Sequence, residues 1–242
     1  MENTGYIALS RQIALGQEMN TIANNIANMN TTGYKSQHTL FTQELLGDGD
    51  DTQKLKAVMD YGQFANLEQG PVKQTGNTFD FAIQGHAYFT VEHSKTGATY
   101  YTRAGNLTLN NDKEITTAAG HLIIGEGGPI RVPDDATNIK VGTDGTITSD
   151  QGQIGKFKLA EFNNEFELKL SGDGLLSTVQ RPLPPETSTI HQGMVEDSNV
   201  QAVVEMTRMI EVSRNYQMNQ KILQNEHERI RNAVNKIAQS VK

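Results

Sequence analysis

Apolar residues recur at helical spacing near the N-terminus of the chain. The intervals alternate between four and three residues, which is the pattern of a helix that packs along one seam against a partner helix. The seam positions are Leu15, Met19, Ile22, Ile26 and Met29. Gly33 follows them and can adopt the left-handed conformation that ends helices. The pattern therefore predicts an N-terminal helix within residues 1–35.

Asparagine is frequent in the same segment, although Asn is a poor helix former. Packing against another element must therefore favour the helix over other conformations. In a helical bundle, a buried Asn amide can form an interhelical hydrogen bond that fixes the register. We expect Asn25 to take part in such an interaction between subunits.

The C-terminal segment repeats apolar residues at intervals of seven. The repeated positions are Met209, Tyr216, Leu223, Ile230 and Ile237. Polar residues Ser213, Gln220 and His227 stand at the second seam position that we infer, so the stripe is half polar. A helix over this segment would be roughly 60 Å long at about 1.5 Å per residue. A helix of that length is better explained by pairing along it than by two surface helices on one core, which is the alternative.

Between the two ends the apolar period changes to two. Short alternating segments such as Phe79–Phe81 and Phe166–Leu170 are separated by turns rich in Gly, Asn and Asp, as half-buried strands are. These segments predict a β-rich domain over residues 71–189. Residues 36–70 show no clear period, so we interpret them as an irregular connector. The expected class is α+β, with N- and C-terminal helices that pair as a coiled-coil-like bundle and a central all-β domain.

Composition follows the same division. All six Pro lie between residues 71 and 185, and residues 41–189 hold 20 of the 28 acidic residues but only 12 of the 21 basic ones. The net charge of −7 therefore belongs to the middle of the chain. An acidic chain lacks the basic footprint of a nucleic-acid binder, so we expect no nucleic-acid partner. Its apolar runs are too short to cross a bilayer, so we expect no direct membrane insertion.

No motif in the sequence indicates catalysis, a cofactor or a metal. The chain has no Cys, which excludes disulfides, thiolate metal sites and a cysteine nucleophile. Its six His form no HxH or HExxH pattern, and no GxSxG motif occurs. The run that contains Gly155 and Lys156 lacks the first Gly and the Ser or Thr of a phosphate-binding loop. We therefore expect a protein that is not an enzyme and has no cofactor, metal or small-molecule substrate.

Several blocks of the sequence resemble the bacterial flagellar rod and hook proteins. The N-terminal block reads ANNIANMNTTGYK over Ala23–Lys35 and is long and specific. Within the family, the Tyr6–Ser10 opening and the modest length are more similar to the proximal rod subunit than to the longer distal rod and hook subunits. The remaining blocks that carry the resemblance are Thr75–Asn77, Asp80–Gly85, Tyr88–Val91, Tyr101–Asn106, Glu196–Val200 and parts of the C-terminal segment.

The resemblance implies a structural role in the flagellar basal body. Subunits of this family pair their terminal helices in a bundle that lines the axial channel, hold the β domain outward and stack helically to transmit torque across the periplasm. Residues 1–35 and 190–242 would then be rod-core helices, and the seam residues of both would form the subunit interaction. The implied partners are other rod subunits, further copies of the chain itself and the flagellar type III export apparatus. Export would need no cleaved signal peptide, and Glu2 and Arg11 interrupt the pattern of one.

Other functions stay open on the residues alone. The chain could be a distal rod or hook paralogue of the same family. It could also be a periplasmic β domain that binds glycan or scaffolds a partner and uses its helices only to dimerise. An unrecognised hydrolase is a third alternative.

Overall fold

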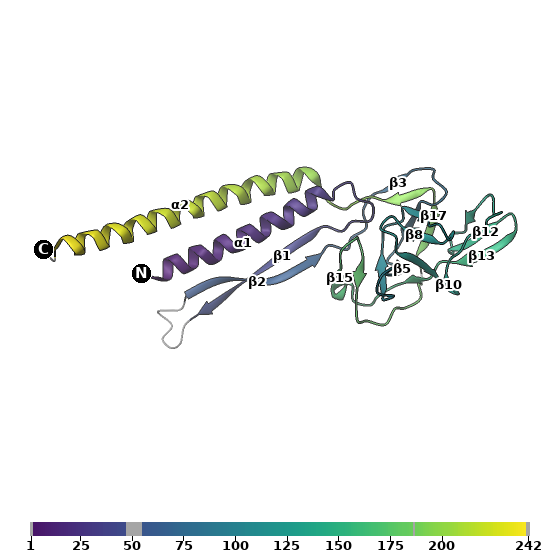
Figure 1. Ribbon diagram of the computed structural model, residues 1–242, viewed down its shortest axis with the longest axis horizontal. Coiled ribbons are helices and arrows are strands. Elements are labelled where there is room, and N and C mark those ends of the chain that lie inside the picture. The colour runs from purple at the N-terminus through teal and green to yellow at the C-terminus, as the bar shows by residue number, and fades with distance from the viewer. Residues whose placement is uncertain (1, 47–54, 186, 241–242) are drawn as a thin grey trace. The chain divides into compact units, whose positions relative to one another are not determined.

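The computed structural model describes residues 2–46, 55–185 and 187–240, with side chains for 5–40, 62–185 and 187–236. The chain divides into two compact units (Figure 1). Unit 1 comprises Met1–Ala27, Gln37–Phe64 and Gln201–Lys242, and unit 2 comprises Asn28–Ser36 and Ala65–Val200. Two long helices and several sheets are present in these residues, which confirms the α+β class.

Unit 1 contains two long helices that lie side by side. Helix α1 spans Glu2–Ala27 and helix α2 spans Ala202–Ser240, and they run antiparallel (Figure 1). Their 26 and 39 residues correspond to lengths of about 39 and 58 Å. Because α2 is the longer helix, its C-terminal part extends beyond the start of α1 (Figure 1).

A β-hairpin completes unit 1 and corrects the predicted irregular connector over residues 36–70. Strand β1 spans Gln37–Leu46 and pairs with β2, which spans Leu55–Ala65; β1 also contacts α1. A polar contact attaches this hairpin to α1, since the Gln63 side-chain amide of β2 donates to the Thr21 hydroxyl over 3.3 Å. Within the hairpin, the rings of His38 in β1 and Phe64 in β2 lie 5.4 Å apart. Neither contact follows apolar periodicity, so the sequence pattern did not reveal the hairpin.

Unit 2 is built around a nine-stranded sheet in its described residues. Its main path runs in the order β15 (Lys169–Leu170), β16 (Leu176–Ser177), β6 (Thr99–Thr102), β5 (Tyr88–Glu92), β9 (Leu122–Gly125), β8 (Ile115–Thr117) and β7 (Leu107–Leu109). Off this path, β14 (Leu159–Ala160) pairs with β5, and β10 (Gly128–Pro129) pairs with β9. A separate sheet joins β11 (Lys140–Val141), β12 (Thr146–Ser149) and β13 (Gly152–Lys156). A short 3₁₀ helix, η2, spans Glu165–Glu167.

The core of unit 2 is aromatic and aliphatic. Phe157 packs edge-on against both Phe81 and Phe89, with ring centroids 5.2 and 5.5 Å apart. A second cluster places Tyr101 edge-on to Phe162 at 4.7 Å. Such aromatic pairs contribute about 0.5–1.5 kcal/mol each beyond the area that they bury.

The chain stays in unit 2 as far as Val200, which differs from the predicted C-terminal helix over residues 190–242. Strand β17 (Thr189–Gln192) pairs with β4 (Phe81–Gln84), and β18 (Met194–Glu196) pairs with β3 (Val72–Gln74). The predicted boundary therefore falls inside a strand, and the helix begins at Ala202. These short strands contain few apolar residues, so the pattern did not separate them from the helix.

Candidate assembly interface

The contact between α1 and α2 has a small apolar centre. Leu15 and Ile22 of α1 are buried together with Val212 of α2. Four partly buried residues pack around them, namely Met19, Ile26, Met209 and Tyr216. The structure therefore brings together six of the residues that the sequence predicts for the interface, plus Val212, which it did not predict.

Asn25 is buried at the end of this contact nearest the hairpin. Its side-chain amide donates to the Gln37 carbonyl over 2.9 Å and to the Glu205 carboxylate over 3.3 Å. Its amide oxygen accepts from the Gln37 backbone N–H, also at 2.9 Å. Asn25 thus joins α1 to α2 and to the first residue of β1, and a buried polar group that is bonded in this way fixes a register.

Further polar contacts fix the antiparallel alignment along the helices. The Asn219 side-chain amide donates to the Ala8 carbonyl at 2.7 Å, and both residues are buried. The Arg208 guanidinium donates twice to one oxygen of Glu18, at 2.9 and 3.1 Å. Because Arg208 and Glu18 keep part of their solvent contact, this ion pair contributes at most about 1 kcal/mol. The ion pair therefore contributes more to the alignment of α1 on α2 than to the stability of unit 1.

The second seam row of α2 differs from the one inferred from the sequence. The buried row is Glu205, Val212 and Asn219, which also repeats every seven residues. Gln220 and His227, which we assigned to that row, are exposed. Two of the three true members are polar, so an apolar stripe could not identify them. The feature of the sequence that could have identified this row is its interval of seven residues, at positions three or four residues from Met209 and Tyr216.

The remaining predicted interface residues lie outside this contact. Met29 is half-buried in the turn after α1 and belongs to unit 2. Leu223 is half-buried and is not part of the apolar centre. Ile230 is 50% exposed, on the part of α2 that continues past the start of α1. The side chain of Ile237 lies outside the described residues.

Apolar side chains also stay exposed on the outer faces of both helices. On α1 three of them, Tyr6, Leu9 and Ile13, lie three and four residues apart and so share one face, and Ile7 is exposed beside them. On α2 the exposed set is Val203, Val204, Met206, Ile210, Met218, Ile222, Ile230 and Val234. Contiguous exposed apolar surface is typical of a protein-protein contact.

A buried ionic network lies in unit 2. The Lys35 ammonium donates to the Glu196 carboxylate and to the Glu68 carbonyl, both at 2.7 Å. The Arg103 guanidinium donates to the other Glu196 oxygen at 3.4 Å and to the Gly85 carbonyl at 2.7 Å. Burial lowers the pKa of Lys35, and the Glu196 charge opposes that shift. One carboxylate therefore compensates two buried cations.

The described residues contain neither a side-chain cluster for a metal ion nor a membrane-spanning helix. Among them, no group of three or more His, Cys, Asp or Glu side chains could hold a metal ion. No helix in the described part of the chain is long and apolar enough to cross a bilayer.

Three segments of the chain match families of flagellar proteins. Residues 6–35 match "Flagella basal body rod protein", residues 82–149 match "Flagellar hook protein FlgE/F/G D1 domain", and residues 191–236 match "Flagellar basal body rod FlgEFG protein C-terminal". The chain is 36% identical over 243 residues to the flagellar basal-body rod protein FlgF of Caulobacter vibrioides, covering 98% of both chains. The chain belongs to the flagellar basal-body rod protein family.

Other members of the rod protein family show similar agreement. FlgF of Rhizobium meliloti is 35% identical, with 88% of this chain and 89% of that one covered. The rod protein FlgG of Agrobacterium fabrum is 34% identical, with 90% and 92% covered. The chain is therefore a structural subunit of the flagellar rod, in the basal body, and assembles with other rod subunits. The matched segments include most of α1, much of unit 2 and most of α2.

Proposed function

We propose that this chain is a proximal rod subunit, as in FlgF, and that its α1–α2 pair forms the core of the rod. In this arrangement the helices pair with those of neighbouring subunits as a coiled-coil-like bundle and line the axial channel, while unit 2, the β-rich part, faces outward. The observation that carries the proposal is the apolar surface left uncovered on α1 and α2. Leaving a large apolar side chain in water instead of burying it costs about 1.5–3 kcal/mol.

The predicted interface residues divide into two groups under this proposal. Those that pack within one chain set the alignment of α1 on α2, through Leu15, Ile22 and Asn25 above all. Those on the overhanging part of α2 contact the next subunit, and Ile230 and Ile237 belong to this group. Contacts between different faces of identical subunits generate a helical polymer when the rotation does not close. Such a polymer transmits motor torque along its axis.

The location and partners follow from the same proposal. The subunit crosses to the periplasmic side through the flagellar type III export apparatus, without a cleaved signal peptide. There it contacts other rod subunits and further copies of itself. The support is the similarity to named rod proteins along nearly the whole chain.

A pair of substitutions on the outer face of α1 tests the proposal. Leu9→Asp with Ile13→Asp places charges on side chains that are exposed in the single chain. We expect the helical circular dichroism of the purified chain to stay within a few per cent of its original value. Cells that carry this variant should lose the rod, seen by electron microscopy of basal bodies, and should stop swimming.

Asn20→Asp is the matched control, because Asn20 is exposed on the same helix without being apolar. This control should build rods and support motility. Normal rods from the Leu9 and Ile13 variant would contradict a rod core formed by this face.

The similarity to FlgG supports a second position within the rod. The FlgG of Agrobacterium fabrum is 34% identical over 90% of this chain, close to the value for FlgF of Rhizobium meliloti. A distal rod subunit would lie nearer the hook than a proximal one. Electron microscopy of basal bodies that carry a tagged chain distinguishes the two positions, since a tag near the hook would contradict the proximal assignment.

A further inference from the structure

An exposed aromatic side chain projects from a well-ordered turn of unit 2. Phe166 lies in η2 and is 89% exposed. We call residues 164–168 the Phe166 turn. Asn164 caps it, because its side-chain oxygen accepts from the Phe166 backbone N–H at 3.2 Å and its amide donates to Glu167 at 3.0 Å. Leu168, which is buried, attaches the other end to the core.

The Phe166 turn is also held from the side. The Gln180 amide donates to the Asn164 carbonyl at 2.6 Å, and the Asn164 backbone N–H donates to the Gln180 side-chain oxygen at 3.4 Å. Glu165 and Glu167 precede and follow Phe166 in the chain, and the Glu165 carboxylate lies 3.1 Å from Nδ1 of His86. Because the backbone of the turn is already held, it loses little conformational entropy when a partner buries the ring, as at the centre of protein interfaces.

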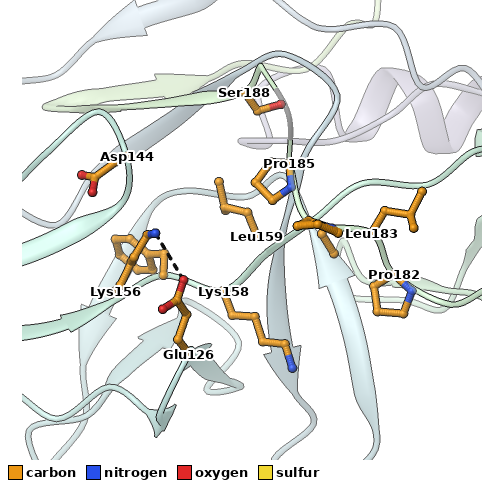
Figure 2. Close-up of a pocket in the computed structure, with 12 residues that line it drawn as sticks. Glu126, Asp144, Lys156, Lys158, Leu159, Pro182, Leu183, Pro185 and Ser188 are labelled. Atoms are coloured by element: carbon orange, nitrogen blue, oxygen red, sulfur yellow. Dashed lines mark ion pairs between the residues drawn. The ribbon is translucent and has the colours of Figure 1, made fainter.

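A pocket of about 470 Å³ lies elsewhere on the same unit (Figure 2). Its apolar wall is formed by Leu159 of β14 and by the segment Pro182–Pro185. Leu183 fixes this segment, since it exchanges two backbone hydrogen bonds of 2.9 Å with Glu161. We call it the proline-walled pocket. Two of its wall residues, Leu159 and Leu183, belong to paired backbone, so this part of the wall is formed without a ligand.

Charged side chains lie at the rim of the proline-walled pocket. The Lys156 ammonium lies 3.2 Å from the Glu126 carboxylate, and the Lys158 ammonium points away from that pair (Figure 2). Asp144 accepts from the Thr146 hydroxyl at 2.6 Å and from the Thr146 backbone N–H at 3.1 Å. Among the described residues no ion pair holds Lys158. The rim therefore presents a cation to an incoming acidic group.

We propose that the proline-walled pocket of one copy of this chain receives the Phe166 turn of a second copy. The phenyl ring would contact Leu159 and the proline wall, and Glu167 would lie beside Lys158. The complementarity is both apolar and electrostatic: an exposed aromatic ring followed by the exposed Glu167 matches an apolar pocket with a lysine at its rim. Because Phe166 is almost fully exposed in its own chain, its ring does not fill its own pocket.

The contact joins two different surfaces, so it is directional. Each copy would offer one turn and one pocket, and a row of copies would extend without closing unless its rotation forms a ring. This inference rests on the proposed function in one respect, since it adds an outer contact to a subunit that polymerises through its helices. It assigns to unit 2 a contact that the helices do not make.

Cross-linking with single cysteines tests the contact, because the natural chain has no Cys. Two full-length variants, Glu165→Cys, which keeps the Phe166 ring beside the new thiol, and Leu159→Cys, are purified separately, mixed and oxidised. We expect the mixture to form at least fivefold more disulfide-linked dimer than a mixture of Leu159→Cys with Lys95→Cys, in which the exposed Lys95 reports random collision. A yield no higher than that control would overturn the proposal.

Exchange of the charges at positions 158 and 167 tests whether the pocket binds the Phe166 turn or a different partner. Adding Lys158→Glu to the Leu159→Cys variant should reduce the cross-linked dimer severalfold, and adding Glu167→Lys to the Glu165→Cys variant should restore it. Failure of that restoration would overturn the electrostatic match. Oxidation of the Leu159→Cys variant inside flagellated cells should yield no link to a different protein, and such a link would assign the pocket to another partner. Rod assembly of the Leu9 and Ile13 variant is measured separately, so failure here leaves the helix proposal standing.

Discussion

The ammonium of Lys35 lies 2.7 Å from the carboxylate of Glu196, although 161 residues separate them in the chain. Their side chains are 3% and 1% exposed. The other Glu196 oxygen meets Arg103, and the backbone N–H of Gly70 donates to the oxygen that Lys35 contacts, at 3.0 Å. One carboxylate thus joins segments from the beginning, middle and end of the chain inside unit 2.

Removal of the Lys35 charge should destabilise unit 2 strongly. In Lys35→Met, Glu196 keeps only the longer contact to Arg103 and the Gly70 N–H, so a buried carboxylate becomes undercompensated. Breaking a buried ion pair in this way costs about 3–5 kcal/mol. Urea unfolding followed by the near-ultraviolet circular dichroism of tyrosine measures this loss.

Lys73→Met is the matched control for that substitution, because Lys73 lies on β3 with an exposed side chain. We expect its free energy of unfolding to stay within about 0.5 kcal/mol of the natural chain. An equal loss in both variants would show that Glu196 does not depend on Lys35.

Substitution of Gly33 should be far more costly than substitution of a helical glycine. Gly33 has a φ of 68°, and an added Cβ would lie 2.4 Å from the Ala104 nitrogen and 2.6 Å from the Arg103 carbonyl carbon. Gly33→Ala should therefore lower the free energy of unfolding by more than about 1 kcal/mol. Gly16→Ala should raise it by roughly 0.5–1 kcal/mol, since its Cβ would meet no atom within 4 Å and Ala favours a helix. Thermal unfolding of the two variants in parallel checks the opposite signs.

Loss of the Asn25 amide should loosen unit 1. Asn25→Ala leaves the Gln37 backbone groups and Glu205 without that partner, for an expected cost of about 1–3 kcal/mol. The readout is the thermal midpoint of the helical signal at 222 nm. Asn20→Ala is the control: it changes an exposed Asn on the same helix and should leave the midpoint unchanged or slightly higher. Since Ala favours a helix more than Asn does, a fall of the same size in both variants would show that the loss does not come from the Asn25 hydrogen bonds.

The stability of unit 2 should decrease in strongly alkaline solution. Burial raises the pKa of Tyr88 above its usual value of 10.0, so the folded chain keeps this proton after the unfolded chain has lost it. Above pH 10 the unfolded state binds fewer protons, and stability falls by about 1.4 kcal/mol per pH unit for such a group. Tyr88→Phe should show a shallower fall by about that amount in urea unfolding between pH 10 and pH 11. Tyr6→Phe, at an exposed position of α1, should leave the slope as it was.

The sequence indicated the two helices and the apolar residues of their contact, because those residues repeat at regular intervals. Leu15, Ile22 and Tyr216 repeat at helical spacing, and periodicity detects such residues directly. The other seam row contains Glu205 and Asn219, whose burial depends on partners far along the chain. Periodicity counts them as surface residues, so it could not identify that row.

The sequence pattern did not predict the β1–β2 hairpin or strands β17 and β18, for a related reason. Strand β1 reads QHTLFTQELL and does not alternate between apolar and polar residues. Strand β17 reads TIHQ and has a single large apolar residue, Ile190, which is buried. Short strands of this kind depend on pairing with a distant partner, and local pattern carries no information about that partner.

The pairing of β17 and β18 has a consequence for the time course of folding. Their partners β4 and β3 are made more than a hundred residues earlier, with Ile190 opposite Ile83 and Val195 opposite Lys73. Contacts between such distant residues make folding slow, because the closure of a long loop precedes them. A chain delivered amino end first cannot complete unit 2 until Glu196 has emerged. Most of its length is therefore delivered before these two sheets, β17 with β4 and β18 with β3, can close.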